Sequence, residues 1–425
     1  MKLNYKRTIL VGFAFFLISA FWQAYDTVVP LILTNKFGMK QLSSGIIMSL
    51  DNIFAVFMLP VFGAISDRIN TKYGRRTPFI FFGTIAATVF FSLLGYVNNV
   101  GIFVVVLLFA LLSMATFRSP AVALMPDVTV KPLRSKGNAI INLMGTAGGI
   151  IVLGLGIVFK TNEKGKTDFG IYMIIVALLM IAALVVFLLT VKERKWAKDM
   201  EIDTVKYCID EDEEPIDGIK RNLNSAELKS LILILASVVL WYIGYNAVTS
   251  KYSVYASEVL EVPYTVTLMV AQGAAIISYI PVGLIASRVG RKKTILAGVI
   301  MLTAAFGSAA FIKAGTPEVV MYLLFALAGI GWATINVNSF PMVVELAKVG
   351  DVGKYTGFYY TASMSAQIVT PIFSGALVDL CGWWIFFPYA AVFAGLAFVT
   401  MFFVKHGDSR PDRVGALESL GGADD

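Results

Sequence analysis

Three charged residues lie well inside long apolar runs of the sequence, namely Asp26, Asp51 and Arg118. An unpaired charge in the middle of a bilayer costs about 3 kcal/mol on insertion scales, so these side chains should face a cavity or one another. Two carboxylates against one guanidinium leave one surplus negative charge, which a proton or a Na⁺ ion can cancel. We predict that Asp26 binds this cancelling cation, H⁺ or Na⁺, which we call the coupling ion. We also predict that Asp51 pairs with Arg118. If the ion is Na⁺, we expect its site at Asp26 and Asp51. The alternative is that all three charged residues form a purely structural network.

Aromatic and amide side chains recur on the same apolar runs. Flat aromatic faces suit the C–H side of a sugar ring, and amides or carboxylates bind its hydroxyl groups. Trp22, Tyr25 and Asp26 share one helix face by their spacing of three and four residues. Each of these residues alone also fits ordinary packing, but together they indicate a sugar or glycoside site. The predicted substrate-binding residues are Trp22, Tyr25, Asn142, Trp241, Tyr245, Asn246, Gln272, Trp332, Asn336, Asn338, Tyr359 and Gln367.

The composition places these runs in a lipid bilayer. Of the 425 residues 57% are hydrophobic and 15% are charged, whereas a soluble protein carries about a quarter of its residues as charges. Because about 20 apolar residues in a helix cross the hydrocarbon, we predict an all-α membrane protein with twelve transmembrane helices. The predicted spans lie near 9–33, 42–64, 77–97, 100–125, 138–159, 169–191, 230–250, 264–286, 294–313, 319–343, 355–379 and 383–404.

The distribution of Lys and Arg predicts the orientation of these spans. With an even number of spans, both termini share one side with the loops that follow even-numbered helices. That side holds 27 of the basic residues and the opposite side holds seven, so the positive-inside rule puts both termini in the cytoplasm of a cell-membrane protein. The net charge of +7 is explained by this asymmetry, and we expect the bilayer and not a nucleic acid as the partner.

No pattern in the sequence indicates an enzyme or a cofactor site. Lys164–Thr167 resembles the end of a phosphate-binding loop, but Lys160 stands where the first glycine is required. The single histidine, His406, follows the last predicted span, which disfavours Ser-His catalysis or a metal centre. We therefore expect neither a cofactor nor a metal other than the coupling Na⁺.

The sequence is organised as two halves that repeat. One polar stretch, 192–229, divides the spans six and six, and a shift of about 220 positions lays Tyr25-Asp26 over Tyr245-Asn246. Two six-helix halves repeated in parallel are typical of transporters in which one bundle rocks against the other around a midplane site. The predicted domains are an N-terminal bundle (1–191), a cytoplasmic linker (192–229), a C-terminal bundle (230–404) and a cytoplasmic tail (405–425).

A cluster of charges follows the second span in the stretch GAISDRINTKYGRRTPFIFFG (63–83), and a weaker copy follows the eighth span. We expect these charges to make charge-assisted hydrogen bonds to neighbouring helix ends and to hold the cytoplasmic face closed. The alternative is that the positive charges only anchor this loop on the cytoplasmic side of the membrane. That alternative accounts for the arginines but not for Asp67. The predicted residues of this cytoplasmic gate are Gly63, Asp67, Arg68, Gly74, Arg75, Arg76, Asp127, Arg288, Arg291 and Glu345.

This motif and its weaker copy resemble the signature of the major facilitator superfamily. The loop SDRINTKYGRRTPFI and the segment GKYTGFYY (353–360) are similar to the sucrose:proton symporters and to the glycoside-pentoside-hexuronide:cation symporters. The chain departs from the first branch in FRSPAVALMPD, where Val122 replaces an arginine and Leu111 falls near the position of the proton-carrying aspartate. The second branch places acidic residues in helices 1 and 2, as Asp26 and Asp51 do, although not in matching local motifs.

Residues and resemblance together predict a monomeric secondary transporter that couples a sugar or glycoside to H⁺ or Na⁺. One alternative is an exporter of metabolites or drugs with the same fold, because a fold does not determine a substrate. A second alternative is a membrane sensor or scaffold that transports nothing. The paired aromatic and amide faces favour sugar over drugs, and the costly buried carboxylates favour transport over a scaffold.

Overall fold

The computed structural model describes residues 3–130, 133–161, 168–206, 224–346 and 352–407. Parts of the predicted linker (207–223) and tail (408–425) lie outside these residues. The described chain is helical, and the pairing of Thr71 with Gly74 is its single β-bridge. Twelve of its helices are long and apolar enough to cross a membrane, which confirms the predicted fold class.

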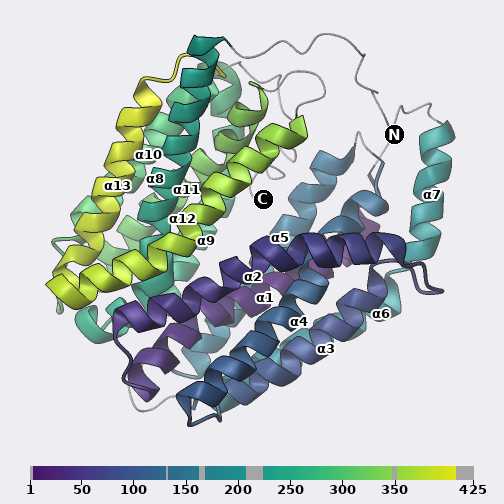
Figure 1. The fold of residues 1–425 in the computed structure, drawn as a ribbon, viewed down its shortest axis with the longest axis horizontal. Coiled ribbons are helices and arrows are strands. Elements are labelled where there is room, and N and C mark those ends of the chain that lie inside the picture. The colour runs from purple at the N-terminus through teal and green to yellow at the C-terminus, as the bar shows by residue number, and fades with distance from the viewer. Residues whose placement is uncertain (1–2, 131–132, 162–167, 207–223, 347–351, 408–425) are drawn as a thin grey trace. The chain divides into compact units, whose positions relative to one another are not determined.

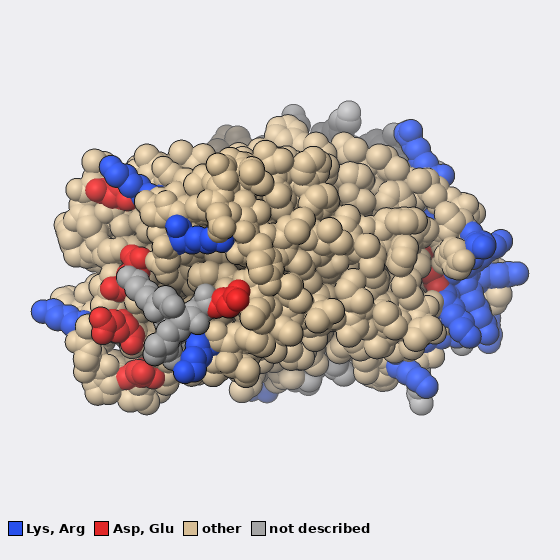
Figure 2. All heavy atoms as spheres, turned by 90° about the horizontal axis from the view of Figure 1, so that it is seen from below, with Lys and Arg blue, Asp and Glu red and all other residues tan. Residues whose placement is uncertain are grey.

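The chain divides into two compact units (Figure 1). The first unit comprises residues 1–39 and 47–211, and the second comprises residues 40–46 and 212–425. On the face drawn in Figure 2, charged side chains gather at two opposite ends and a broad uncharged band separates them. That band is the surface expected of helices surrounded by hydrocarbon.

The first unit contains six long helices and one short one. Apolar residues fill almost every position of the long helices, because their outer faces meet lipid as well as protein, so they lack the polar stripe of soluble helices. The core contains Phe21, Phe91 and Phe117, which are fully buried. The helices are α1 (Tyr5–Leu31, extended by a π-helical turn, Ile32–Lys36), α2 (Gln41–Arg68), α3 (Thr77–Leu94), α4 (Val100–Asp127), α5 (Arg134–Val158), α6 (Phe169–Thr190) and the short α7 (Glu193–Lys206).

The second unit contains the remaining six long helices. Its first helix also ends in a π-helical turn, as α1 does in the first unit. The helices are α8 (Ser225–Tyr255, extended by Ala256–Leu260), α9 (Tyr264–Val289), α10 (Arg291–Ala309), α11 (Glu318–Val344), α12 (Val352–Cys381) and, after a 3₁₀ turn (Trp383–Ile385), α13 (Phe386–Phe402).

The two units pack their helices by one shared scheme. In the first unit α1 packs on α4, α5 and α6, and α3 packs on α4 and α6; in the second, α8 packs on α11, α12 and α13, and α10 packs on α11 and α13. Helices α1 and α3 therefore have the same partners as the helices seven labels later, whereas α9 packs on α11 and α2 does not pack on α4 in this way. This correspondence supports the internal repeat that the sequence indicated.

Helix α8 differs from its predicted extent. The prediction ended this span at residue 250, whereas the helix continues to Tyr255 and its π-helical turn to Leu260. Lys251, expected at a membrane boundary, is instead only 2% exposed. The chain thus holds a buried basic residue that sequence inspection missed.

Candidate functional site

The first unit brings its three membrane-embedded charges together. Asp26 on α1, Asp51 on α2 and Arg118 on α4 come from three different helices, and each is partly exposed. Asp26 interacts electrostatically with both Asp51 and Arg118, and Arg118 interacts with both carboxylates. Partial exposure of these groups fits a polar crevice within the unit, because charges facing hydrocarbon would be strongly destabilising.

Arg118 does not form the direct ion pair with Asp51 that the sequence suggested. Its guanidinium carbon lies 5.3 Å from the centre of the Trp22 ring, a cation–π arrangement. Asp51 Oδ1 instead accepts hydrogen bonds from the backbone N–H (2.5 Å) and the side-chain amide (2.8 Å) of Asn52. The indole holds the guanidinium over its face, so Arg118 acts on the carboxylates through space and not by contact.

Three aromatic side chains precede Asp26 on α1 and pack on one another. Trp22 and Tyr25 meet edge to face with ring centres 5.3 Å apart, and Phe21 stacks on Tyr25 at 6.2 Å. Tyr25 is fully buried and its hydroxyl donates to the carbonyl of Met48 at 3.5 Å. Trp22 keeps a buried indole N–H without a hydrogen-bond partner. On the predicted face of α1, the ring of Tyr25 is therefore fixed in the core, and the indole N–H of Trp22 remains available as a hydrogen-bond donor.

Asn142 on α5 lies in a helix that packs closely against α1. Gly145 and Gly148 make this possible, because a Cβ at either position would crowd Ser19 or the backbone of Phe16. Asn142 is 4% exposed, and neither its amide nitrogen nor its amide oxygen has a hydrogen-bond partner. Buried polar groups are nearly always paired in proteins, so this amide is a strong candidate for contact with a ligand or water.

The second unit contains an aromatic counterpart built on α8 and α11. Tyr245 and Trp332 stack nearly parallel, with ring centres 3.7 Å apart and 6° between their planes. Asn246, the next residue along α8, keeps a side-chain amide nitrogen without a partner. The structure thus brings Tyr245 and Trp332 together, and Asn246 follows Tyr245 on the same helix with an amide nitrogen that has no partner.

Gln272 and Asn336 flank the same region of the second unit. A side chain at Gly329 would collide with the carbonyl of Ala271, so α9 crosses α11 closely just beside Gln272. Asn336 is one helical turn from Trp332 on α11, and both Gln272 and Asn336 are partly exposed. Both residues remain candidates for the predicted polar lining.

Of the four remaining predicted binding residues, two have polar groups that are already bonded within the protein. Asn338 is 2% exposed and donates to the carbonyl of Thr334 at 2.9 Å, so its amide serves its own helix. Tyr359 is 1% exposed and shares a hydrogen bond of 3.0 Å with Ser339. Trp241 is fully buried, although its indole N–H has no partner, whereas Gln367 on α12 is partly exposed. Asn338 and Tyr359 are therefore core residues in this structure, because their polar groups are already satisfied.

Arg76 is the centre of the charged motif after α2. It is 5% exposed, and its guanidinium bonds Asp67 (2.5 Å), Asp127 (2.6 Å) and the hydroxyl of Ser66 (2.5 Å). Burial alone would lower the pKa of Arg76, but the two carboxylates outweigh that effect and raise the pKa above its ordinary value. The motif thus ties the ends of α2 and α4 to the loop before α3.

Glu193 completes this network and was not identified from the sequence. Its carboxylate accepts hydrogen bonds from the backbone N–H groups of Arg75 (2.6 Å), Arg76 (2.9 Å) and Thr77 (2.8 Å) at the start of α3. A Cβ at Gly74 would collide with this carboxylate, which gives a physical reason for glycine there. The prediction had assigned Glu193 to a solvated linker, but it is 4% exposed at the start of α7.

The second unit repeats part of the gate. Arg291 forms an ion pair with Glu345, the residue that the repeat aligns with Asp127. In contrast, the side chains of Arg68, Arg75 and Arg288 are exposed. Gly63 faces Ser119, whose hydroxyl would crowd a Cβ. The structure therefore divides the predicted gate into a bonded core and an outer basic surface.

A second polar cluster lies within the second unit at the start of α2. The carboxylate of Asp379 accepts bonds from the backbone N–H groups of Gln41 (2.9 Å) and Leu42 (2.7 Å). Lys251 donates to the carbonyl of Gln41 at 3.1 Å. Gly375 approaches that carbonyl too closely to carry a side chain. Sequence inspection missed this cluster, because nothing in the local spacing links residue 41 to residue 379.

Comparison with known proteins places this geometry in a family. The model of the Major Facilitator Superfamily matches residues 11–366 and 268–420. An uncharacterized MFS-type transporter from Methanocaldococcus jannaschii is 24% identical over 382 residues, which is 88% of each chain.

Solved transporters share the fold at low identity. The inward-open xylose transporter XylE from E. coli is 13% identical, with 98% of this chain and 99% of that chain covered and a TM-score of 0.69. The nucleoside transporter NupG is 16% identical, with 94% and 98% covered and a TM-score of 0.65. The peptide transporter POT with bound sulfate is 12% identical, with 94% and 93% covered and a TM-score of 0.69. With the family model matching most of its length, the chain belongs to the Major Facilitator Superfamily of membrane transporters.

Proposed function

We propose that this transporter carries a sugar or glycoside together with H⁺ or Na⁺ by alternating access. The observation that carries the proposal is the charge balance in the first unit. Asp26 and Asp51 interact with each other and with one arginine, Arg118. One negative charge is therefore in excess, and binding of a cation would cancel it before the site closes.

Unpaired polar groups within the first unit support a hydroxyl-rich substrate. The unpaired amide of Asn142 and the unpaired indole N–H of Trp22 offer one acceptor and several donors in the same unit. A substrate that satisfied these groups would remove the cost of leaving them buried and unpaired, about 1–3 kcal/mol each. A purely apolar substrate would leave that cost in place, which favours a sugar over most drugs.

The second unit supports the same class of substrate with a different surface. The stacked pair Tyr245 and Trp332 forms a flat aromatic wall, and Asn246 provides an unpaired amide nitrogen beside it. Aromatic faces pack well against the C–H face of a sugar ring while amides bind its hydroxyls. We assign coupling to the first unit and a share of substrate recognition to both units.

The charged motifs fit a gate on the cytoplasmic side of a cell-membrane protein with both termini inside. Arg76, held by Asp67 and Asp127, lies just before α3, and Arg291, held by Glu345, lies at the start of α10. The excess of Lys and Arg on this side supports the orientation. In this scheme, rocking of one bundle against the other requires bonds near these motifs to break and form.

The proposal is tested with purified protein in proteoliposomes. Uptake of labelled disaccharides, aryl glycosides, xylose, nucleosides and dipeptides is measured under an imposed pH gradient, an imposed Na⁺ gradient, or neither. We expect a sugar or glycoside to accumulate only under one of the gradients. Gradient-driven accumulation of nucleosides or dipeptides alone would contradict the sugar assignment, and substrate binding without flux would favour a sensor.

A further inference from the structure

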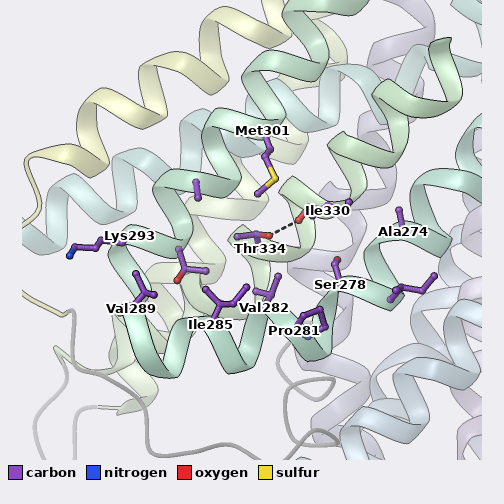
Figure 3. A pocket seen from close by; sticks show the side chains of 13 residues that line it. Ala274, Ser278, Pro281, Val282, Ile285, Val289, Lys293, Met301, Ile330 and Thr334 are labelled. Carbon is purple, nitrogen blue, oxygen red and sulfur yellow. Dashed lines mark hydrogen bonds between the residues drawn. The ribbon is translucent and has the colours of Figure 1, made fainter.

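A groove in the second unit lies apart from the candidate transport site. It has a volume of about 610 Å³ and is lined by α9, α10 and α11, which is within the range of about 300–1,000 Å³ of small-molecule sites. Figure 3 shows Ala274 near one end and Lys293 at the other, with Pro281, Val282, Ile285 and Val289 forming one wall.

The groove uses a different face of α11 from the aromatic site. Ile330 and Thr334 contribute to its lining, and each lies two residues from Trp332. Two residues correspond to about 200° around a helix, so these side chains point away from the face that carries Trp332. The contents of the groove therefore do not share the space next to Tyr245 and Trp332.

The groove runs along more than half of a membrane span. On α10 it extends from Lys293, near the start of the helix, to Met301, a rise of about 12 Å, and on α9 from Val289 to Ala274, a rise of about 22 Å at 1.5 Å per residue. Half of the hydrocarbon thickness is about 15 Å. The groove thus extends from the end of a membrane span past its middle.

The lining of the groove favours an apolar body. The hydroxyl of Ser278 donates to the carbonyl of Ala275 at 2.7 Å, and that of Thr334 donates to the carbonyl of Ile330 at 2.6 Å. Both hydroxyl protons are therefore already used within their own helices. A saturated hydrocarbon chain can fill this space without leaving a buried donor unpaired.

One end of the groove carries a positive charge. Lys293 is exposed and makes no hydrogen bond or ion pair with the described residues, whereas its neighbour Lys292 donates to the carbonyls of Phe402 (2.8 Å) and Val404 (2.6 Å). A free ammonium group at the end of an apolar channel is complementary to a molecule with an anionic head and a long apolar tail.

We propose that this groove binds one acyl chain of an anionic phospholipid from the surrounding leaflet, with the phosphate of its headgroup at Lys293. The acyl chain lies along Ile285 and Val282 toward Ala274, and the headgroup stays at the membrane surface. The site is separate from the proposed sugar transport and does not depend on it.

Native mass spectrometry of the full-length, delipidated protein tests this site with phosphatidylglycerol and phosphatidylcholine as probes. We expect the wild type to prefer phosphatidylglycerol, and Lys293→Gln to lower its affinity for this lipid about fivefold, as expected for loss of about 1 kcal/mol per charge. Phosphatidylcholine should bind the variant as before. Lys405→Gln, which removes an exposed charge elsewhere in the unit, is the matched control and should change neither affinity.

A second variant tests the apolar part of the groove. Ala297 lines it, and Ala297→Phe should displace the acyl chain and lower the binding of both lipids while substrate counterflow stays unchanged. Equal binding of the two lipids by the wild type, or the same loss in Lys405→Gln as in Lys293→Gln, would overturn the proposal in favour of a non-selective lipid annulus. If Ala297→Phe fails to fold, the Lys293→Gln comparison decides the question alone.

Discussion

Asn142 and Asn338 are the same side chain in opposite situations. Both are almost fully buried, but Asn142 leaves its whole amide unpaired while Asn338 donates to the carbonyl of Thr334. An unpaired buried amide gains hydrogen bonds when a ligand arrives, whereas a paired one has nothing further to offer. The sequence predicted both asparagines as binding residues from residue type and helix position. It could not separate them, because their hydrogen-bond partners depend on packing that residue spacing does not determine.

This difference predicts opposite effects for the two alanine substitutions. Asn142→Ala should raise the KM for the transported substrate about tenfold, since one or two hydrogen bonds are lost on binding, with little change in thermal stability. Asn338→Ala should lower the thermal unfolding midpoint and leave KM unchanged. Transport kinetics and thermal unfolding of both variants in the same detergent provide the test, and equal KM values would remove Asn142 from the site.

At the scale of helices, two helix starts are capped by carboxylates from far along the chain. Glu193 caps α3, and Asp379 caps α2. Free N–H groups and the helix dipole both favour a negative charge at such a position. The helices themselves could be predicted from apolar runs, but these caps could not, since each joins residues separated by more than a hundred positions.

The cap on α3 predicts a stabilising role for Glu193. Glu193→Gln removes the charge and should lower the free energy of unfolding by about 1 kcal/mol. Glu201→Gln on the same short helix is the matched control, because Glu201 is exposed. Thermal unfolding of the two variants should show a lower midpoint for Glu193→Gln alone; equal midpoints would show that the carboxylate charge is not required.

The cap on α2 predicts that Asp379 limits access to the start of that helix. Ser44 is 2% exposed, so a cysteine introduced there in a background without Cys208 and Cys381 should react slowly with a maleimide. Adding Asp379→Asn weakens two charge-assisted bonds and should speed the labelling several-fold. Asp168→Asn, which weakens the analogous cap on α6, should leave the rate unchanged, and equal acceleration by both would contradict a local effect.

At the scale of the whole molecule, the internal repeat could be predicted from the sequence. Two halves with similar helix packing need similar residues at matching positions. Twelve apolar runs and the paired charged motifs correspond to features of the structure. Tyr245 and Trp332 were each predicted at the site, but not as a stacked pair. The contact between Arg118 and Trp22 was not predicted either, since a guanidinium between two carboxylates and an indole has more than one favourable partner.

The bonded core of the gate predicts a kinetic effect. Asp67→Asn removes one of the two carboxylates that hold Arg76 and should lower the transport rate about tenfold, a change of about 1.4 kcal/mol in the barrier, with normal expression. Lys72→Gln, which removes a charge from the same loop outside the group bonded to Arg76, is the control. Unchanged uptake by Asp67→Asn would exclude this bond from the transport cycle.

The central claim is that the surplus charge at Asp26 couples the cation to the substrate, and one measurement tests it most directly. Asp26→Asn protein in proteoliposomes is compared with wild type for accumulation against a gradient and for counterflow at equal cation concentrations. The account predicts that accumulation is lost while counterflow continues, because an amide has no charge for the ion to cancel. Accumulation at the wild-type level in Asp26→Asn would contradict it.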